Sequence, residues 1–300
     1  MNFFFQQLLN ALLLGSIYAL ISVGYTMVYG VLSMINFAHG DIFMVSSYIA
    51  FFFSAFLLRF APHLFPILTF AATILVAMIL SSLLAVIIER LAYKPLRTAP
   101  RVSAVITALG VGMFLETITL ALIGPEPHQI APLIPFRIYN LGGVSFSSNH
   151  IMVFAVSFIC MFILDLIIRR TMVGKAMRAI SFDKTIVPMM GVPVDTIISA
   201  TFALGAAVAA VGGTMYGMVY SLDPYMGILI GWWAFIAAVV GGIGNVRGAM
   251  IGGLILGVVQ VFVAAYMAST YRDFIAFAML LLLLVFRPTG ILGRPKIKKV

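Results

Sequence analysis

LFPILTFAATILVAMILSSLLAVII, residues 64–88, contains no charged side chain in its 25 positions. A helix needs about 20 mostly apolar residues to cross a bilayer, so this stretch predicts a membrane-spanning helix. The rest of the chain has the same character, because 63% of its 300 residues are hydrophobic and only 9% are charged. A soluble fold of this size has too little interior to bury so much apolar surface. The sequence therefore predicts an all-α polytopic integral membrane protein.

Apolar stretches on both sides of residues 64–88 predict about eight or nine transmembrane helices in a single domain, residues 1–300. Two of the predicted spans, 225–240 and 274–286, are short. The second can cross only if the charged side chains that flank it extend to the membrane interface. The N-terminal stretch has no basic region, since the first Lys or Arg is Arg59, so we interpret it as a retained span. The predicted spans are 7–29, 41–58, 64–88, 103–123, 151–168, 197–220, 225–240, 249–268 and 274–286.

The basic residues give this arrangement an orientation, because cytoplasmic loops carry an excess of Lys and Arg. With nine spans and a cytoplasmic C-terminus, 15 basic residues lie inside and 3 lie outside. This predicts an outer N-terminus, a cytoplasmic loop at 169–195 and a periplasmic loop at 124–150. The outer basic residues are Arg59, Arg137 and Arg272, and the inner ones are Arg90, Lys94, Arg97, Arg101, Arg169, Arg170, Lys175, Arg178, Lys184, Arg247, Arg287, Arg294, Lys296, Lys298 and Lys299.

The outer loop, GPEPHQIAPLIPFRIYNLGGVSFSSNH at 124–150, has four prolines and a Gly-Gly pair. This composition predicts either an irregular external cap or a short hairpin.

Charge and motifs exclude several classes of function. The net charge of +9 lies in clusters at the ends of apolar runs, which favours contact with membrane lipid over nucleic acid. The glycine-rich GGIGNVRG at 241–248 lacks the lysine of a phosphate-binding loop. No set of residues has the pattern of a metal site or of a catalytic nucleophile with its base, so we expect no enzyme activity, no metal and no cofactor in this chain.

Few ionisable residues are expected at membrane depth. Glu116 lies within span 103–123, and we favour its interpretation as a carboxylate near the outer headgroups. This scarcity of deep charge argues against coupling to an ion gradient and against a strong ion pair that holds a solute.

The segment INFAHGD, residues 35–41, joins the first two spans and carries Asn36, His39 and Asp41. One interpretation is a tight turn whose Asp caps the following helix. The other is a discontinuous helix that lines a translocation path. The sequence leaves both open.

Small residues recur in two of the later spans. Gly205, Ala209, Gly213 and Gly217 are spaced every fourth residue, as are Gly244, Gly248 and Gly252. Such stripes are typical of close helix packing in membranes, and they also occur on helices that line a path. We favour packing and keep Gly205, Gly213, Gly244, Gly248 and Gly252 as candidates for the path.

Charged residues interrupt the apolar sequence at TMVGKAMRAISFDKTIVPMMG, residues 171–191, between two predicted spans. Nothing breaks a helix between Gly174 and about Ile186, after which Pro188 and Gly191 end it. The faces of this short helix mix apolar and charged side chains, so pattern alone allows either a lipid surface or a protein groove as its contact.

Five stretches together resemble the LivH-type permease subunits of ABC importers for branched-chain amino acids. They occur in the order of that family over nearly the whole chain. They are GSIYALISVGYTMVYGVLSMINFAHGD (15–41), GKAMRAISFDKTIVPMMGV (174–192), FALGAAVAAVGGTMYG (202–217), AFIAAVVGGIGNVRGAMIGGLILG (234–257) and PTGILGRP (288–295).

The resemblance implies a place in the bacterial inner membrane and a set of partners. These are a second, LivM-type permease, two cytoplasmic ATPase subunits that bind ATP and Mg, and a periplasmic protein that delivers leucine, isoleucine or valine. It also implies that the 169–195 loop docks on an ATPase. The residues carried over to this coupling role are Gly174, Lys175, Arg178, Ala179, Asp183 and Gly191. Related permeases also serve urea and short amides, so the solute stays open.

A different class of transporter remains as an alternative. An ion-gradient-driven secondary carrier would transport a small solute without any ATPase, and Glu116 would be its coupling carboxylate.

Overall fold

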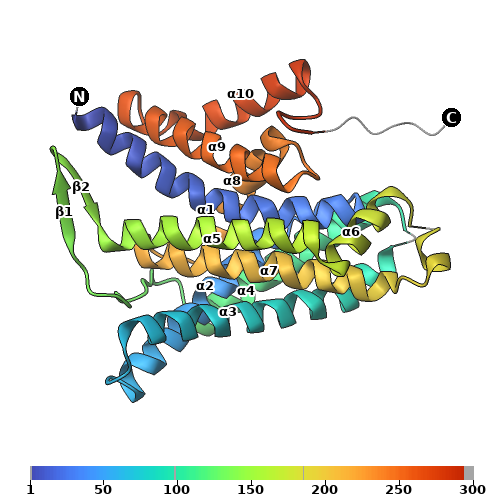
Figure 1. Cartoon of the computed structure of the whole chain (residues 1–300), viewed down its shortest axis with the longest axis horizontal. Helices are drawn as coiled ribbons and strands as arrows, with labels where there is room; N and C mark the ends of the chain where they lie inside the picture. The colour runs from blue at the N-terminus through green and yellow to red at the C-terminus, as the bar shows by residue number, and fades with distance from the viewer. Residues whose placement is uncertain (1, 98, 185, 294–300) are drawn as a thin grey trace.

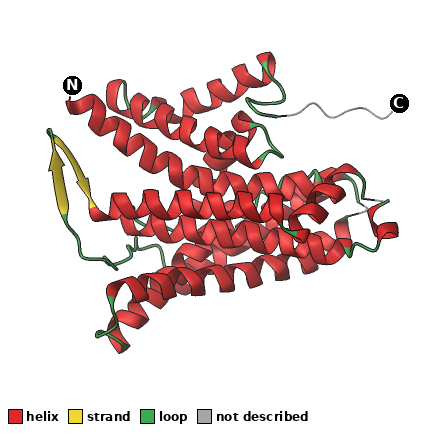
Figure 2. Cartoon of the chain, in the orientation of Figure 1, coloured by secondary structure: helices red, strands yellow, loops and turns green. Residues whose placement is uncertain are grey.

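The computed structural model describes residues 2–97, 99–184 and 186–293, which form a bundle of helices with one small hairpin at one end (Figure 1). Among the described residues, the β-strands are the two strands of this hairpin (Figure 2). The helices are α1 (Asn2–Leu32), α2 (His39–Phe60), α3 (Pro66–Ile88), α4 (Arg101–Ile123), α5 (Ser148–Arg170), α6 (Met172–Phe182), α7 (Val194–Val219), α8 (Met226–Gly241), α9 (Val246–Tyr266) and α10 (Tyr271–Phe286), and the strands are β1 (Ile138–Leu141) and β2 (Val144–Ser147).

Seven of the described helices are long and apolar enough to cross a membrane: α1 to α5, α7 and α9. A π-helical turn at Glu89–Tyr93 and a 3-10 turn at Lys94–Leu96 extend α3. The predicted spans 225–240 and 274–286 correspond to α8 and α10, which have 16 residues each. Such a helix is about 24 Å long, shorter than a hydrocarbon core of about 30 Å. Length and composition therefore support seven spans of the eight or nine predicted.

Helix α1 is the centre of the bundle, buried from Ala11 onward along most of its length. Its closest neighbour is α9, and the two backbones touch where Gly15 and Ala19 face Gly253 and Gly257. Small residues four apart let membrane helices approach this closely. Helices α7, α8 and α5 cover the rest of α1.

The N-terminus and the hairpin share one end of the bundle, which is called the hairpin end below (Figure 1). The Gln6 side chain donates to the Ser145 carbonyl at 3.0 Å and accepts from the Ser145 N–H at 2.8 Å. Helix α6 lies at the opposite end. Residues 291 and 292 donate backbone hydrogen bonds to Val240 and Gly241 at the turn between α8 and α9, which lies toward the α6 end. The first and last described residues therefore lie toward opposite ends.

Of the two alternatives for the outer loop, the structure contains the hairpin. Strands β1 and β2 are antiparallel, with Leu141 opposite Val144. Gly142 and Gly143 between them have φ values of 56° and 85°, the left-handed conformation that tight two-residue hairpin turns require.

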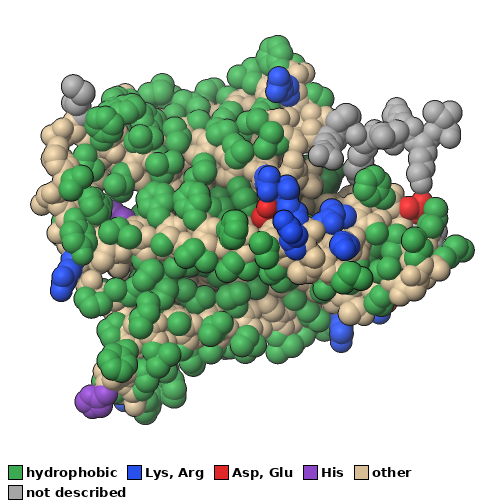
Figure 3. Space-filling model, in the orientation of Figure 1, with side chains coloured by type: hydrophobic (Ala, Val, Ile, Leu, Met, Phe, Trp, Pro, Cys, Tyr) green, Lys and Arg blue, Asp and Glu red, His purple; other side chains and the backbone are tan. Residues whose placement is uncertain are grey.

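Basic and apolar side chains are distributed unevenly along the length of the bundle. Figure 3 shows Lys and Arg gathered mainly toward the α6 end, while apolar side chains cover the flanks of the bundle. Arg294, Lys296, Lys298 and Lys299 lie outside the described residues, as does the side chain of Arg101.

Candidate functional site

The connection between α1 and α2 is a half-buried break that leads back into the bundle. Helix α1 ends at Leu32, where Ser33 takes a left-handed φ of 55°, and α2 starts at His39. A Cβ on Gly24 of α1 would overlap the His39 ring, and Gly24 lies eight residues before the end of α1. That corresponds to about 12 Å along the helix, so the chain turns back into the bundle before α2 begins. The structure thus favours the discontinuous helix over the tight turn.

Asp41 lies deep in the bundle and does not cap α2. The N-cap residue is Ala38, and no side chain bonds to that end of the helix. A Cβ on Gly112 would overlap Asp41 Oδ2, and one on Gly227 would overlap Oδ1. Gly112 is the central residue of the 23-residue helix α4. Asp41 is therefore level with the middle of a transmembrane span.

Helix α8 also begins at this level. After α7 ends, Leu222 exchanges backbone hydrogen bonds of 2.7 and 2.9 Å with His128 of the outer loop. The chain then returns to the centre, where Gly40 of α2 packs directly on Gly227 and Gly231 of α8. The N-termini of α2 and α8 thus meet inside the bundle, and each carries partial positive charge from the helix dipole.

Glu116 lies one helical turn from Gly112, and its carboxyl group is within interaction distance of Asp41. This contact brings Glu116 together with Asp41, whereas its place near the outer headgroups stays a prediction. Asp41 Oδ1 and Glu116 Oε1 have no hydrogen-bond partner among the described residues. Two carboxyl groups do not make a metal site, and no group of three His, Cys, Asp or Glu side chains comes together in the described chain.

Other predicted path residues join this site. The Tyr93 hydroxyl donates to Asn36 Oδ1 at 2.6 Å, which holds the break against the end of α3. His39 lies between Gly24 and Gly205 of α7. Gly213 packs further along α2, against Phe43 and Ser47.

Gly244, Gly248 and Gly252 are not part of the site. Gly248 and Gly252 pack α9 on Gly241 and Ala237 of α8, and Gly244 turns the chain between the two helices with a φ of 94°. Sequence reasoning missed Gly112 and Gly227, which face Asp41. The spacing of Gly112 four residues before Glu116 was a signal, because residues i and i+4 share a helix face.

At the α6 end, the predicted cytoplasmic helix has different bounds. Helix α6 runs from Met172 to Phe182, so the expected end near Ile186 is wrong. Asp183 takes an extended conformation, and its Oδ1 accepts the Ile186 N–H at 3.3 Å. Asp side chains compete in this way with the helical backbone. A 3-10 turn at Val187–Met190 and a left-handed Gly191 with φ 76° complete the segment.

Helix α6 is fixed tightly to the end of α5. The Thr171 hydroxyl accepts from the Gly174 N–H at 3.2 Å, and a Cβ on Gly174 would overlap the Ile168 carbonyl. Arg178 donates to that same carbonyl. Gly174, Met177 and Ile180 form the buried face of α6, with Ala179 partly buried beside them, whereas Lys175, Arg178 and Phe182 are exposed.

Ion pairs connect the helices near α6. Glu89 is fully buried, pairs with Arg97 and accepts the Ser199 hydroxyl at 2.7 Å, so it joins the end of α3 to α7. Asp165 pairs with Arg169 at 3.0 Å and with Arg247 at 2.9 Å, which joins α5 to α9. A displacement of α6 would therefore be transmitted through α5 to α9.

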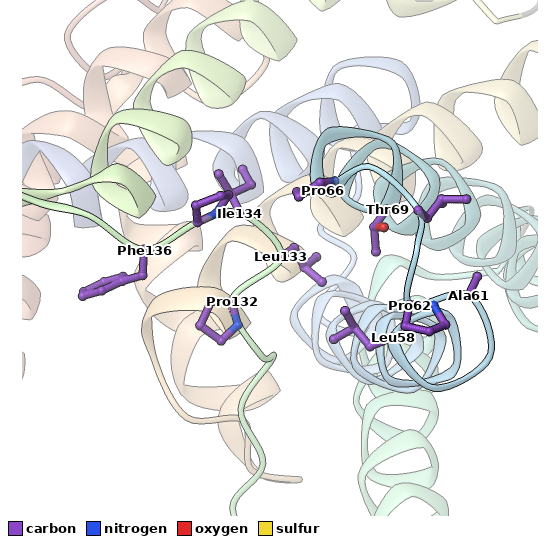
Figure 4. Close-up of a pocket in the computed structure, with 11 residues that line it drawn as sticks. Leu58, Ala61, Pro62, Pro66, Thr69, Pro132, Leu133, Ile134 and Phe136 are labelled. Atoms are coloured by element: carbon purple, nitrogen blue, oxygen red, sulfur yellow. The ribbon is translucent and has the colours of Figure 1, made fainter.

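Two cavities open at the hairpin end, away from Asp41. One of about 310 Å³ lies between the α2–α3 turn and the outer loop, and its lining includes Pro62, Pro66 and Pro132 (Figure 4). The other, of about 480 Å³, is lined by the hairpin and the adjacent ends of α5 and α7. Neither lining includes Asp41 or Glu116.

Comparison with known proteins gives matches over nearly the whole chain. Residues 7–284 match the family described as the permease component of branched-chain amino acid transport systems. The high-affinity branched-chain amino acid transport system permease protein BraD of Pseudomonas aeruginosa is 43% identical over 302 residues, 99% of this chain and 98% of its own length. The LivH permease proteins of Salmonella typhimurium and of Escherichia coli K12 are 41% and 40% identical, each over 99% of this chain and 98% of their length.

Proposed function

The chain belongs to the family of permease components of branched-chain amino acid transport systems, and from this premise we propose that it is the membrane-spanning subunit of an ATP-driven importer in the bacterial inner membrane. Its proposed solutes are leucine, isoleucine and valine. The observation that carries the proposal is the identity of 40–43% with BraD and LivH over 99% of the chain. The seven helices of spanning length agree with a place in the membrane.

The proposed partners are a second, related permease, two cytoplasmic ATPase subunits and a periplasmic binding protein that delivers the amino acid. ATP and Mg would bind to the ATPases. The α6 end would face the cytoplasm, and its concentration of Lys and Arg agrees with the positive-inside rule (Figure 3).

Helix α6 and the turn after it are the proposed docking surface for an ATPase. Phe182, Met189 and Met190 project from this segment with 87%, 88% and 76% of their surface exposed. Large apolar side chains with charged neighbours are typical of an anchor in a protein groove. Of the carried-over residues, Lys175 projects outward, whereas Gly174 and Arg178 fix α6 to α5.

The proposed cycle uses this rigid attachment. Closure of the ATPases on ATP would move α6, the junction with α5 would transmit the movement, and the pair of permeases would alternate between outward and inward access. The break between α1 and α2 and the buried start of α8 give the bundle two non-helical connections near its centre, where such rearrangements are common in transporters.

The matches favour this function over a secondary carrier, because the relatives are components of transport systems. Reconstitution in proteoliposomes tests the choice directly. With its partners, the chain is expected to take up leucine only when ATP is supplied to the ATPase side. Uptake by this chain alone, driven by a proton or sodium gradient, would contradict the proposal.

Phe182→Ala tests the docking surface. A buried aromatic anchor contributes about 2 kcal/mol or more to an interface, so the ATPase is expected to bind permease-containing nanodiscs roughly 30-fold more weakly. Phe136→Ala is the matched control, because Phe136 is also exposed, at 56%, but belongs to the outer loop. Equal binding by the two variants would mean that Phe182 lies against lipid.

A further inference from the structure

We infer that Asp41 and Glu116, where α2, α4 and α8 meet, form a site that receives the α-ammonium group of the transported amino acid. The inference rests on the proposed function, since it assigns part of the solute to residues of this chain. Asp41 is only 5% exposed, and its Oδ1 has no hydrogen-bond partner while it points at the first turn of α8.

The charge balance of the site calls for a cation or a proton. No ion pair of the described residues involves Asp41 or Glu116, although the two carboxyl groups are within interaction distance. Like charges this close, in surroundings of low dielectric constant, repel each other unless a cation or a proton lies between them. A primary ammonium group has one positive charge and three N–H donors, which suits two unbonded carboxylate oxygens.

The surroundings explain how an amino acid head group would be held. Gly112 and Gly227 face the two carboxylate oxygens of Asp41, so on these two sides only helix backbone adjoins its carboxyl group. The N-termini of α2 and α8 meet at the same place, and the partial positive charge of these helix ends favours the solute carboxylate. The site would therefore bind both charges of a zwitterion, in agreement with broken helices whose ends contact solute in other transporters.

In this conformation the helices are packed together at Gly40, Gly227 and Gly231, so the solute would enter when α8 separates from α2. Helix α4 is the looser wall. It packs on α2 and only slightly on α8, and it exposes Met113 and Phe114 beside the site at 66% and 62%. Movement of α4 or α8 would make the carboxyl groups of Asp41 and Glu116 accessible to the solute without unfolding either helix.

The test uses the complete importer in proteoliposomes, with saturating binding protein, and measures leucine taken up per ATP hydrolysed. Asp41→Asn and Glu116→Gln keep the size of each side chain and remove its charge. Each is expected to lower the ratio at least about tenfold, the effect of losing about 1.4 kcal/mol of binding in the path. Glu126→Gln, an exposed carboxylate of the outer loop, is the control and is expected to leave the ratio unchanged.

The possible results separate the explanations. Asn and Gln imitate protonated carboxyl groups, so an unchanged ratio in both variants would mean that a proton balances the pair, and it would overturn the inference. A misfolded variant loses uptake and hydrolysis together, and a lower melting temperature identifies it. If Asp41→Asn lowers the melting temperature, Glu116→Gln on the looser helix α4 decides. Absence of ATP-dependent leucine uptake by the unaltered importer would instead refute the proposed function, and the site with it.

Discussion

Gly253→Leu is expected to prevent the formation of a stable bundle, the largest effect on folding that we predict for any single substitution. Even a Cβ at this position would overlap the backbone of Ala19, and backbone atoms of a central helix cannot rotate away as a side chain can. Helices α1 and α9 would have to separate along the contact that Gly15, Ala19, Gly253 and Gly257 form. Without a hydrophobic driving force between membrane helices, this packing is a principal source of their association.

Gly253→Ala gives a graded version of the same experiment. Overpacking costs about 1–3 kcal/mol, whereas Gly→Ala inside an exposed helix normally stabilises by about 0.5–1 kcal/mol. Gly110 of α4 is the matched control, since an added Cβ there meets nothing within 4 Å. Thermal unfolding of the purified protein in detergent is expected to show a lower midpoint for Gly253→Ala and an equal or higher one for Gly110→Ala. Equal midpoints for the two variants would refute the close α1–α9 contact.

Gly174→Ala is expected to uncouple transport from ATP hydrolysis. The methyl group would overlap the carbonyl of Ile168, so α6 would have to move away from α5 and lose the bond from Arg178. The ATPases would still close on ATP, but less of the movement would reach the bundle. We expect leucine uptake per ATP to fall about tenfold or more, since small displacements of a coupled element have effects of this size.

Arg90→Ala is the control for this experiment, because Arg90 is an exposed basic residue of the π-helical turn after α3 and lies outside the proposed docking segment. Its effect is expected to be small, since it removes one exposed charge without moving α6. A transport ratio that stays normal in Gly174→Ala would show that the α5–α6 junction does not carry the movement. A parallel melting curve checks that the bundle itself remains folded.

Much of the fold could be predicted because hydropathy is a local property. The uncharged stretch at 64–88 corresponds to α3 at Pro66–Ile88, and the predicted span 103–123 corresponds to α4 at Arg101–Ile123. Two short spans were harder, because α8 starts inside the bundle and neither α8 nor α10 has the length of a full crossing. The predicted end of α6 near Ile186 is too late, because Asp183 leaves the helix and its carboxylate accepts a hydrogen bond from the N–H of Ile186.

The sequence by itself determined the class of protein and the approximate bounds of the long apolar helices, and it predicted the short helix α6 and the grouping of the basic residues. Each of these follows from composition within about 20 residues, the length that a bilayer selects. Only the tertiary structure decided that Asp41 lies level with the middle of α4, beside Glu116 and the start of α8. Membrane helices pack together at glycines and other small residues, and similar small-residue patterns recur in several helices of this chain. The local sequence therefore does not specify which glycine faces which carboxylate, and that pairing depends on the packing of the whole bundle.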